Sequence, residues 1–313
     1  MSSQDVPGPR SRTTLGMEIT HREGHPRQTM STHDNLPNDK TRRIALFADL
    51  RDSTDILVNF EQRVYPQPGN PPDDAVSYER FIYDVHESLY KELYLGHEGT
   101  YAEVYGDGIM GVFPEDNAKY ILENLYGLTT TMRSYNDAIR TGMPRPMIDM
   151  GFGISVGEVA FVHYPFDGRD HPVGQCIHEA ARIESITKLY DARILISHRF
   201  FGFAEAFLDA DPRFAYRFID RVILKGFREP VTLFELLMDN DPRYKRKKAA
   251  TPAYTEAYGK YCEKDWSGAK EIFLAVFREY GLGCGAVMAK RCDILANSPP
   301  NHNWNGIWSM KDK

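Results

Sequence analysis

The chain has 313 residues, of which 42% are hydrophobic, and its formal net charge is -6 at pH 7. This length suits one large domain or two modest ones. The acidic balance, without a wider basic field, argues against a nucleic-acid-binding protein. No apolar run approaches the roughly 20 residues that span a bilayer, and the amino terminus lacks a signal-peptide core, so we expect a soluble, cytoplasmic protein.

The cysteines and the amino-terminal segment narrow the class of protein further. Cys176, Cys262, Cys284 and Cys292 show no C-x-x-C spacing, which argues against structural zinc and indicates reduced thiols. Residues 1–40 are rich in Pro, Ser, Thr and Gly without a hydrophobic period, which predicts a disordered tail. A start codon placed too early is the alternative explanation for this segment.

Residues 41–240 mix strand and helix patterns throughout. The apolar run 44–47 predicts a buried strand that a polar turn connects to a helix. Further strands are expected at residues 100–105, 109–113, 147–156, 158–163, 192–197, 216–224 and 231–238, and helices at 78–95, 118–141 and 176–189, with a loop at 65–72. This mixture predicts an α+β fold in which helices cover a sheet.

The composition changes after residue 238. The charged stretch 239–248 predicts a linker at 241–250, and we interpret its basic run as a solvated hinge. Residues 251–313 then form a small helical extension with amphipathic helices at 253–263 and 267–280. Trp266 lies at the joint between these helices, and the aromatic residues of the segment are interpreted as packing anchors.

Two acidic stretches carry the chemistry. Asp49 follows the first strand, and Asp107 lies between Gly106 and Gly108 at the tip of a predicted hairpin. Alone, each is more often a turn former than a ligand. If the strands are neighbours, however, two carboxylates meet beside the start of a helix. Divalent cations prefer such oxygen ligands and phosphates prefer helix N-termini, which suggests metal-assisted chemistry on a nucleoside triphosphate.

Several ordered motifs give the chain a recognisable pattern. They are the runs 47–54 (F-x-D-[IL]-x-x-[ST]-T), 106–110 (G-D-x-x-[ML]), 153–157 (G-[IL]-x-x-G), 174–184 and 224–226. From about Arg43 to Leu237 the chain therefore resembles the catalytic domain of class III nucleotidyl cyclases, with His178 where the family has Asn. The resemblance implies a ferredoxin-like, palm-type antiparallel sheet with covering helices over residues 41–240.

The resemblance also implies roles for individual residues. Asp49, Asp107 and the carbonyl of Leu50 would hold two Mg²⁺ or Mn²⁺ ions, which activate the ribose 3'-hydroxyl for attack on the α-phosphorus. Arg182 would stabilise the transition state, His178 would orient the ribose, and Lys225 would bind the β- and γ-phosphates. The phosphate cradle would be Arg51, Asp52, Ser53 and Thr54, although Arg51 could instead pair with a nearby Asp. Because the family shares its sites between subunits, a homodimer is implied.

Base selection is where the sequence departs most from the family. The two positions that select the base in the family hold Glu103 and His171 in this chain. In the family, Lys with Asp or Thr at these positions recognises adenine, and Glu with Cys recognises guanine. Either residue could merely lie on the surface. A changed pair implies a changed or relaxed choice of base, and the bulkier imidazole could shrink the pocket toward a pyrimidine.

This pattern, in a short cyclase, resembles the pyrimidine cyclases of bacterial anti-phage (Pycsar) systems, which make cyclic UMP or cyclic CMP to activate a separate effector. The sequence-based prediction is conversion of UTP to cyclic UMP. The alternatives are an adenylyl or guanylyl cyclase, with Glu103 mildly favouring guanine, and a degenerate domain that binds a nucleotide and regulates a partner. Recruitment of a partner by the C-terminal helices is a third possibility.

Overall fold

The computed structural model describes residues 40–62, 77–95, 98–142 and 145–310. The predicted disordered tail, apart from Lys40, and the predicted loop at 65–72 lie outside these residues. Within them, no helix is long and apolar enough to cross a membrane.

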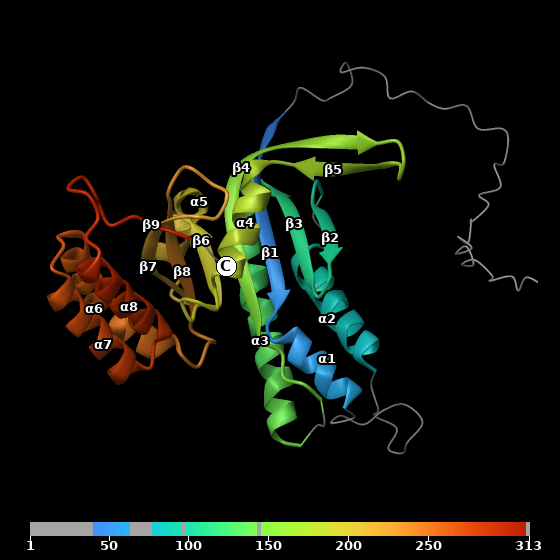
Figure 1. The fold of residues 1–313 in the computed structure, drawn as a ribbon. Coiled ribbons are helices and arrows are strands. Elements are labelled where there is room, and N and C mark those ends of the chain that lie inside the picture. The colour runs from blue at the N-terminus through green and yellow to red at the C-terminus, as the bar shows by residue number, and fades with distance from the viewer. Residues whose placement is uncertain (1–39, 63–76, 96–97, 143–144, 311–313) are drawn as a thin grey trace, which may run out of the picture. The chain divides into compact units, whose positions relative to one another are not determined.

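The described residues form a nine-stranded sheet in the order β2-β3-β1-β4-β6-β8-β7-β9, with β5 paired to β4 (Figure 1). Its strands are β1 (Thr41–Leu50), β2 (Tyr101–Tyr105), β3 (Gly108–Pro114), β4 (Met150–Tyr164), β5 (Arg169–Val173), β6 (Ile194–Ser197), β7 (Phe214–Ile223), β8 (Val231–Met238) and β9 (Trp308–Ser309). The β4–β6 and β7–β9 pairs are parallel and the others are antiparallel.

The helices that cover the sheet are α1 (Ser53–Glu61), α2 (Tyr78–Leu93), α3 (Ala118–Arg140), α4 (Gln175–Ser185), α5 (His198–Ala210), α6 (Tyr244–Cys262), α7 (Trp266–Tyr280) and α8 (Gly283–Asn297), with a short 3₁₀ turn at Glu115–Asn117. Strands and helices are mixed as expected, which confirms the predicted α+β class. The parallel β4–β6 pair follows from α4, which carries the chain back between the two strands.

The central strand β1 divides its side chains between two layers. Ile44, Leu46 and Ala48 belong to a core shared with α1, α2, α3 and α5, whereas Ala45 belongs to a core shared with α4. Since successive side chains of a strand alternate between faces, Asp49 lies on the α4 face. The end of β1 therefore presents its carboxylate toward α4.

Helix α4 packs unusually close to β4. A Cβ atom at Gly153 would overlap the backbone of Ala180 and Glu184, and one at Gly157 would lie 2.9 Å from the Cβ of Cys176. Both glycines are therefore required by the packing of the helix on the strand. Gly157 does not interrupt the strand: the two strands expected at 147–156 and 158–163 are one continuous strand, β4.

The structure differs from the sequence prediction mainly after residue 240. Most of the predicted linker at 241–250 is helical, because α6 begins at Tyr244. The expected solvated hinge is also wrong for Lys247, which is 1% exposed and donates hydrogen bonds to Glu235 and to the Asp191 carbonyl. Pairing with a buried carboxylate explains how a lysine in a charged run becomes part of the core. Four elements were not predicted, namely β5, α5, α8 and β9.

Candidate active site

The turn between β1 and α1 opens onto a cavity of about 380 Å³. It is lined by residues 49–55 together with Glu184, Ser185, Thr187 and Lys188. Asp52 precedes α1 in a left-handed conformation (φ 57°), and its side chain does not cap the helix. Instead its carboxylate pairs with the ammonium group of Lys188. The first N–H groups of α1 thus lack a side-chain cap beside a cavity, an arrangement that suits an anion.

The predicted hairpin brings Asp107 to the same end of the sheet as Asp49. Ala48 pairs with Ile109, which sets the β2–β3 turn next to the end of β1. A Cβ atom at Gly108 would lie only 2.7 Å from Oδ1 of Asp49 and 2.6 Å from the Ala48 carbonyl oxygen. Gly108 is therefore needed for the close approach of the two acidic stretches.

A third carboxyl group, Glu184 of α4, joins these two. Burial, and then the negative charge of Asp49, raise the pKa of Glu184 to about 7, with a further contribution from Asp107. This residue belongs to the motif at 174–184, yet sequence reasoning gave it no role. Its neighbour Lys188 was also missed. The signal for both would have been their positions after Arg182: Glu184 lies two residues further along α4, and Lys188 lies six residues further, in the turn that follows this helix.

This donor set suits a hard divalent cation. Carboxylate oxygens are the preferred ligands of Mg²⁺ and Mn²⁺, and clustered carboxylates gain from a cation that offsets their repulsion. Asp49 and Asp107 are the residues that would hold it. A group of three or more metal-ligating side chains is not found among the described residues, so water and phosphate oxygens would have to complete the coordination.

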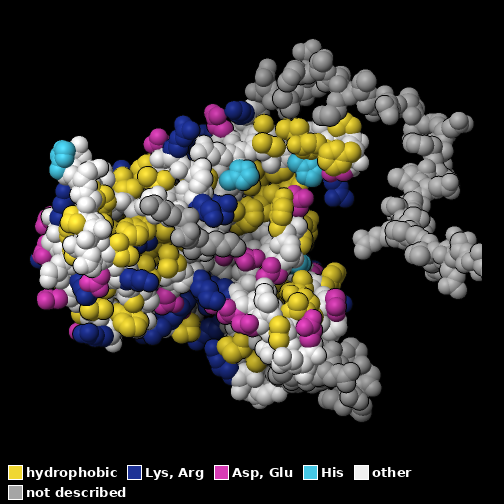
Figure 2. All heavy atoms as spheres, viewed as in Figure 1, with side chains coloured by type: hydrophobic (Ala, Val, Ile, Leu, Met, Phe, Trp, Pro, Cys, Tyr) yellow, Lys and Arg dark blue, Asp and Glu magenta, His cyan; other side chains and the backbone are white. Residues whose placement is uncertain are grey.

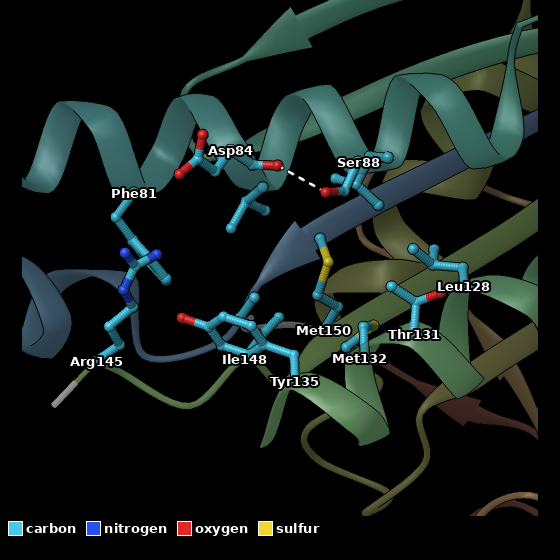
Figure 3. Close-up of a pocket in the computed structure, with 12 residues that line it drawn as sticks. Phe81, Asp84, Ser88, Leu128, Thr131, Met132, Tyr135, Arg145, Ile148 and Met150 are labelled. Atoms are coloured by element: carbon cyan, nitrogen blue, oxygen red, sulfur yellow. Dashed lines mark hydrogen bonds between the residues drawn. The ribbon is translucent and has the colours of Figure 1, made fainter. Parts of the chain in front are cut away.

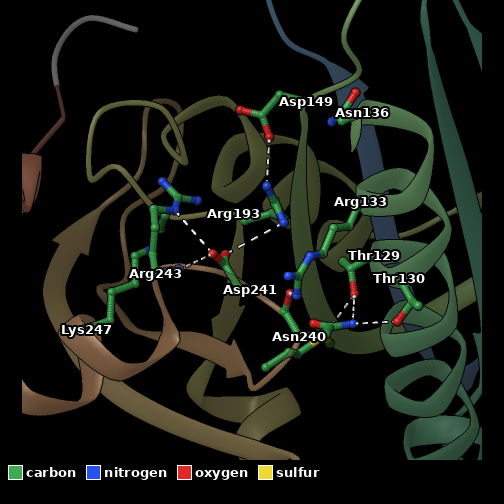
Figure 4. A network of polar contacts seen from close by, with 12 residues as sticks. Thr129, Thr130, Arg133, Asn136, Asp149, Arg193, Asn240, Asp241, Arg243 and Lys247 are labelled. Carbon is green, nitrogen blue, oxygen red and sulfur yellow. Dashed lines mark hydrogen bonds and ion pairs between the residues drawn. The ribbon is translucent and has the colours of Figure 1, made fainter. Parts of the chain in front are cut away.

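Arg51 lines the cavity, but its guanidinium group already has partners in the protein. Its guanidinium pairs with Asp149 at 3.2 Å and donates to the Ala192 carbonyl, and its side chain is 11% exposed. Asp149 in turn pairs with Arg193, which also pairs with Asp241 (Figure 4). The pairing alternative fits this geometry better than phosphate binding by Arg51.

Asp107 does not line this cavity, and neither do three further predicted residues. His178 and Arg182 are exposed on one side of α4, and Lys225 is exposed in the turn after β7. Their exposure leaves all three side chains accessible. Within the described part of a single chain, these three residues therefore do not join Asp49 in the lining of this cavity.

The two predicted base-selecting residues do lie together. His171 of β5 approaches Glu103 of β2, with 3.9 Å between Nδ1 and Oε2. The β4–β5 hairpin reaches across the ends of β3 and β2 to make this contact (Figure 1). Hydrophobic side chains gather along that hairpin (Figure 2), and Phe166 at its turn is 82% exposed.

A separate cavity of about 160 Å³ lies between α2, α3 and β4 (Figure 3). Its walls are largely apolar, including Phe81, Val85, Leu128 and Met150, with Arg145 and Asp84 at one end. None of the predicted site residues lines it. It is distinct from the polar cavity beside Asp49.

The chain is similar in sequence to two adenylate cyclases. No family model matches the chain. It is 28% identical over 168 residues to the terminal-differentiation-specific adenylate cyclase of Dictyostelium discoideum, covering 51% of this chain and 8% of that protein. It is 27% identical over 206 residues to an adenylate cyclase of Anabaena cylindrica, covering 63% of this chain and 37% of that protein. The matched part thus spans well under half of either relative.

Solved structures with a similar chain trace include a bacterial light-regulated adenylyl cyclase, at 11% identity and TM-score 0.48, covering 64% of this chain and 52% of that one. The guanylyl cyclase Cya2 is 21% identical with TM-score 0.43, covering 65% and 95% of the two chains. The adenylyl cyclase CyaB from P. aeruginosa is 17% identical with TM-score 0.43, covering 64% and 95%.

Proposed function

We propose that this protein is a class III nucleotidyl cyclase, which converts a nucleoside triphosphate to its 3',5'-cyclic nucleotide and pyrophosphate. The observation that carries the proposal is that strand pairing brings the stretches around Asp49 and Asp107 together at one end of the sheet, where the uncapped helix α1 begins after Asp49. The sequence similarity to two adenylate cyclases supports it.

The residues around the cavity have separate proposed roles in binding metal ions and phosphate. Two bound Mg²⁺ or Mn²⁺ ions would lower the pKa of the 3'-hydroxyl and offset the charge of the triphosphate. Asp49 and Asp107 would hold the ions, and the Leu50 carbonyl would be a further ligand. The N–H groups at the start of α1 and the hydroxyls of Ser53 and Thr54 bind phosphate oxygens. Lys188 can leave Asp52 for a phosphate, because both side chains of that ion pair are more than half exposed.

The complete site requires a second copy of the chain. His178 and Arg182 are exposed on α4 and do not line the cavity beside Asp49. In a homodimer, Arg182 of one subunit stabilises the charge that develops on the α-phosphoryl group held by the other. His178 orients the ribose, and Lys225 binds the β- and γ-phosphates. Each subunit then supplies half of two equivalent sites.

We propose UTP as the substrate and cyclic UMP as the product, in the role of a second messenger in anti-phage defence with a separate effector. The pair of Glu103 and His171 supports a base other than adenine, because an ionised carboxylate only accepts hydrogen bonds and so cannot donate to the N1 acceptor of adenine. The competing candidate is a purine cyclase, which the similarity to adenylate cyclases favours. A domain that binds nucleotide without turnover remains the candidate from another class.

Product analysis separates these candidates. The full chain is incubated with equal ATP, GTP, CTP and UTP plus Mn²⁺, and the products are identified by mass spectrometry, with Asp107→Ala as the inactive control. Cyclic UMP that is absent from the variant supports the proposal. Cyclic AMP or cyclic GMP as the main product overturns the choice of substrate. No cyclic product from any triphosphate overturns the cyclase itself.

A further inference from the structure

The carboxylate of Glu103 is hydrogen-bonded to two tyrosine side chains. Tyr101 Oη donates to Glu103 Oε2 at 2.8 Å, and Tyr105 Oη donates to the same oxygen at 3.1 Å. Residues 101, 103 and 105 share one face of β2 because side chains two apart on a strand point the same way. Two hydroxyl groups thus converge on one oxygen of the carboxylate.

The partner residue His171 is also fixed. Its Nε2 lies 2.6 Å from Asp167 Oδ2, and its Nδ1 lies 3.4 Å from Tyr101 Oη. Its ring also packs edge-on against Tyr164, with 5.4 Å between the centroids. Glu103, Asp167 and His171 have side chains that are 25–32% exposed, so the cluster can still reach a ligand.

The two tyrosines limit the number of hydrogen bonds that the Glu103 carboxylate can still accept. An ionised carboxylate offers about two lone-pair sites on each oxygen. Both sites of Oε2 are taken by the two tyrosines, and no hydrogen bond to Oε1 is found within the described part of the chain. Glu103 therefore presents a single acceptor oxygen rather than a two-oxygen fork.

The bases differ in what they offer to such an acceptor. Guanine places an N1–H and an N2–H side by side, a pair that matches both oxygens of a carboxylate. Uracil has one imide N–H, at N3, between two carbonyl groups. The two guanine N–H bonds are parallel, so a single oxygen cannot accept both in good geometry even though it has two lone-pair sites, and a poorly paired donor costs affinity. Uracil's single donor is satisfied.

We infer that Tyr101 and Tyr105 are specificity-determining positioning residues, which saturate one oxygen of Glu103 and so favour a base with a single N–H over guanine. The inference rests on the proposed function, in that Glu103 faces the base. Asp167 has the matching task of holding the imidazole of His171 against the cluster.

The test removes the two hydroxyls and measures a ratio. Wild type, Tyr101→Phe/Tyr105→Phe and Tyr105→Phe alone are given equal UTP and GTP with Mn²⁺, and cyclic UMP and cyclic GMP are quantified by mass spectrometry. Freeing Oε2 restores a two-oxygen acceptor, so the ratio of cyclic UMP to cyclic GMP should fall about tenfold or more in the double variant. A purely structural defect lowers both products together and leaves the ratio unchanged.

Two controls keep the result interpretable. Tyr90→Phe removes the hydroxyl of a tyrosine on α2 that is 48% exposed, and it should leave the ratio as in wild type. Tyr105 is 52% exposed, so the single variant keeps the test valid if the double variant does not fold. A ratio within about twofold of wild type in both variants overturns the inference while leaving the cyclase intact. A wild type that forms no cyclic nucleotide overturns the proposed function and the inference with it.

Discussion

Two groups of charged side chains in this molecule are built on opposite principles. In the first group, the negative charges of Asp49 and Asp107 act on Glu184, whose pKa is raised first by burial and then by these two carboxylates. In the second group, between the sheet and the C-terminal helices, Glu235 is buried with Arg217 and Lys247. Burial alone would raise the pKa of Glu235, but the two cations outweigh it and lower that pKa.

The contrast separates stability from function. A buried carboxylate with two cations holds elements together: β7 supplies Arg217, β8 supplies Glu235 and α6 supplies Lys247. Like charges forced together weaken the fold, and they persist where a cation or a substrate compensates them. The carboxylate group therefore fits a binding role, and the Glu235 group fits the attachment of the C-terminal helices to the sheet.

The largest expected effect is on activity at the carboxylate group. Asp49→Asn removes a charged ligand of the proposed ions, so cyclase activity should fall about 1000-fold, which corresponds to roughly 4 kcal/mol of transition-state stabilisation. The same change relieves repulsion, so the melting temperature of the metal-free protein should stay the same or rise. Initial rates with Mn²⁺ and thermal melts in EDTA measure both. Asp116→Asn, at an exposed position before α3, is the matched control, and a clearly lower melting temperature for Asp49→Asn would contradict this contrast.

The opposite result is expected at the second group. Glu235→Ala leaves Arg217 and Lys247 buried without their carboxylate, which should cost about 3–5 kcal/mol of unfolding free energy. Urea unfolding followed by circular dichroism measures the loss. The exposed Glu205→Gln on α5 should change stability by less than about 0.5 kcal/mol. If Glu235→Ala is as stable as the control, the proposed attachment of the C-terminal helices by this group is wrong.

These two groups also show how much of the structure could be predicted from the sequence. The strand before Asp49 and the hairpin around Asp107 are local patterns, so both were predicted correctly, and their approach followed from pairing the strands. Glu184 was missed because its position depends on α4 packing against Gly153, a contact that no local pattern reveals. Lys247 was assigned to a linker because the sequence does not show that its partner, Glu235 in β8, is a buried charge.

Because the pKa of Glu184 is raised, the pH dependence of stability gives a further test of the carboxylate group. Its pKa is about 7 in the folded protein, against an ordinary value of 4.5. Between these values the folded state binds more protons than the unfolded state, so stability falls as pH rises through this range and levels off above it. The shift corresponds to at most about 3.4 kcal/mol. Glu184→Gln should therefore be increasingly more stable than wild type as pH rises from about 4.5 to 7.

Urea unfolding in EDTA across this range measures the difference between Glu184→Gln and wild type. A difference that does not change with pH would mean that burial and the neighbouring carboxylates do not raise the pKa of Glu184. Addition of Mg²⁺ should reduce the difference, because a cation near Asp49 and Asp107 offsets the charge that raises the pKa of Glu184.

The smallest effect concerns the contact that brings α4 to the carboxylate group. Gly153→Ala places a methyl group against the backbone of α4, so the helix must move away from β4, at a cost of about 1–3 kcal/mol. Gly202→Ala on α5 meets no atom within 4 Å and should instead stabilise by about 0.5–1 kcal/mol, since alanine is the better helix former. Unfolding curves of the two variants test the opposite signs. Because the displaced helix also carries Glu184, Gly153→Ala should lose activity beyond its loss of stability, whereas Gly202→Ala should keep wild-type activity. Equal effects of the two substitutions would show that the close approach of α4 does not set the geometry of the site.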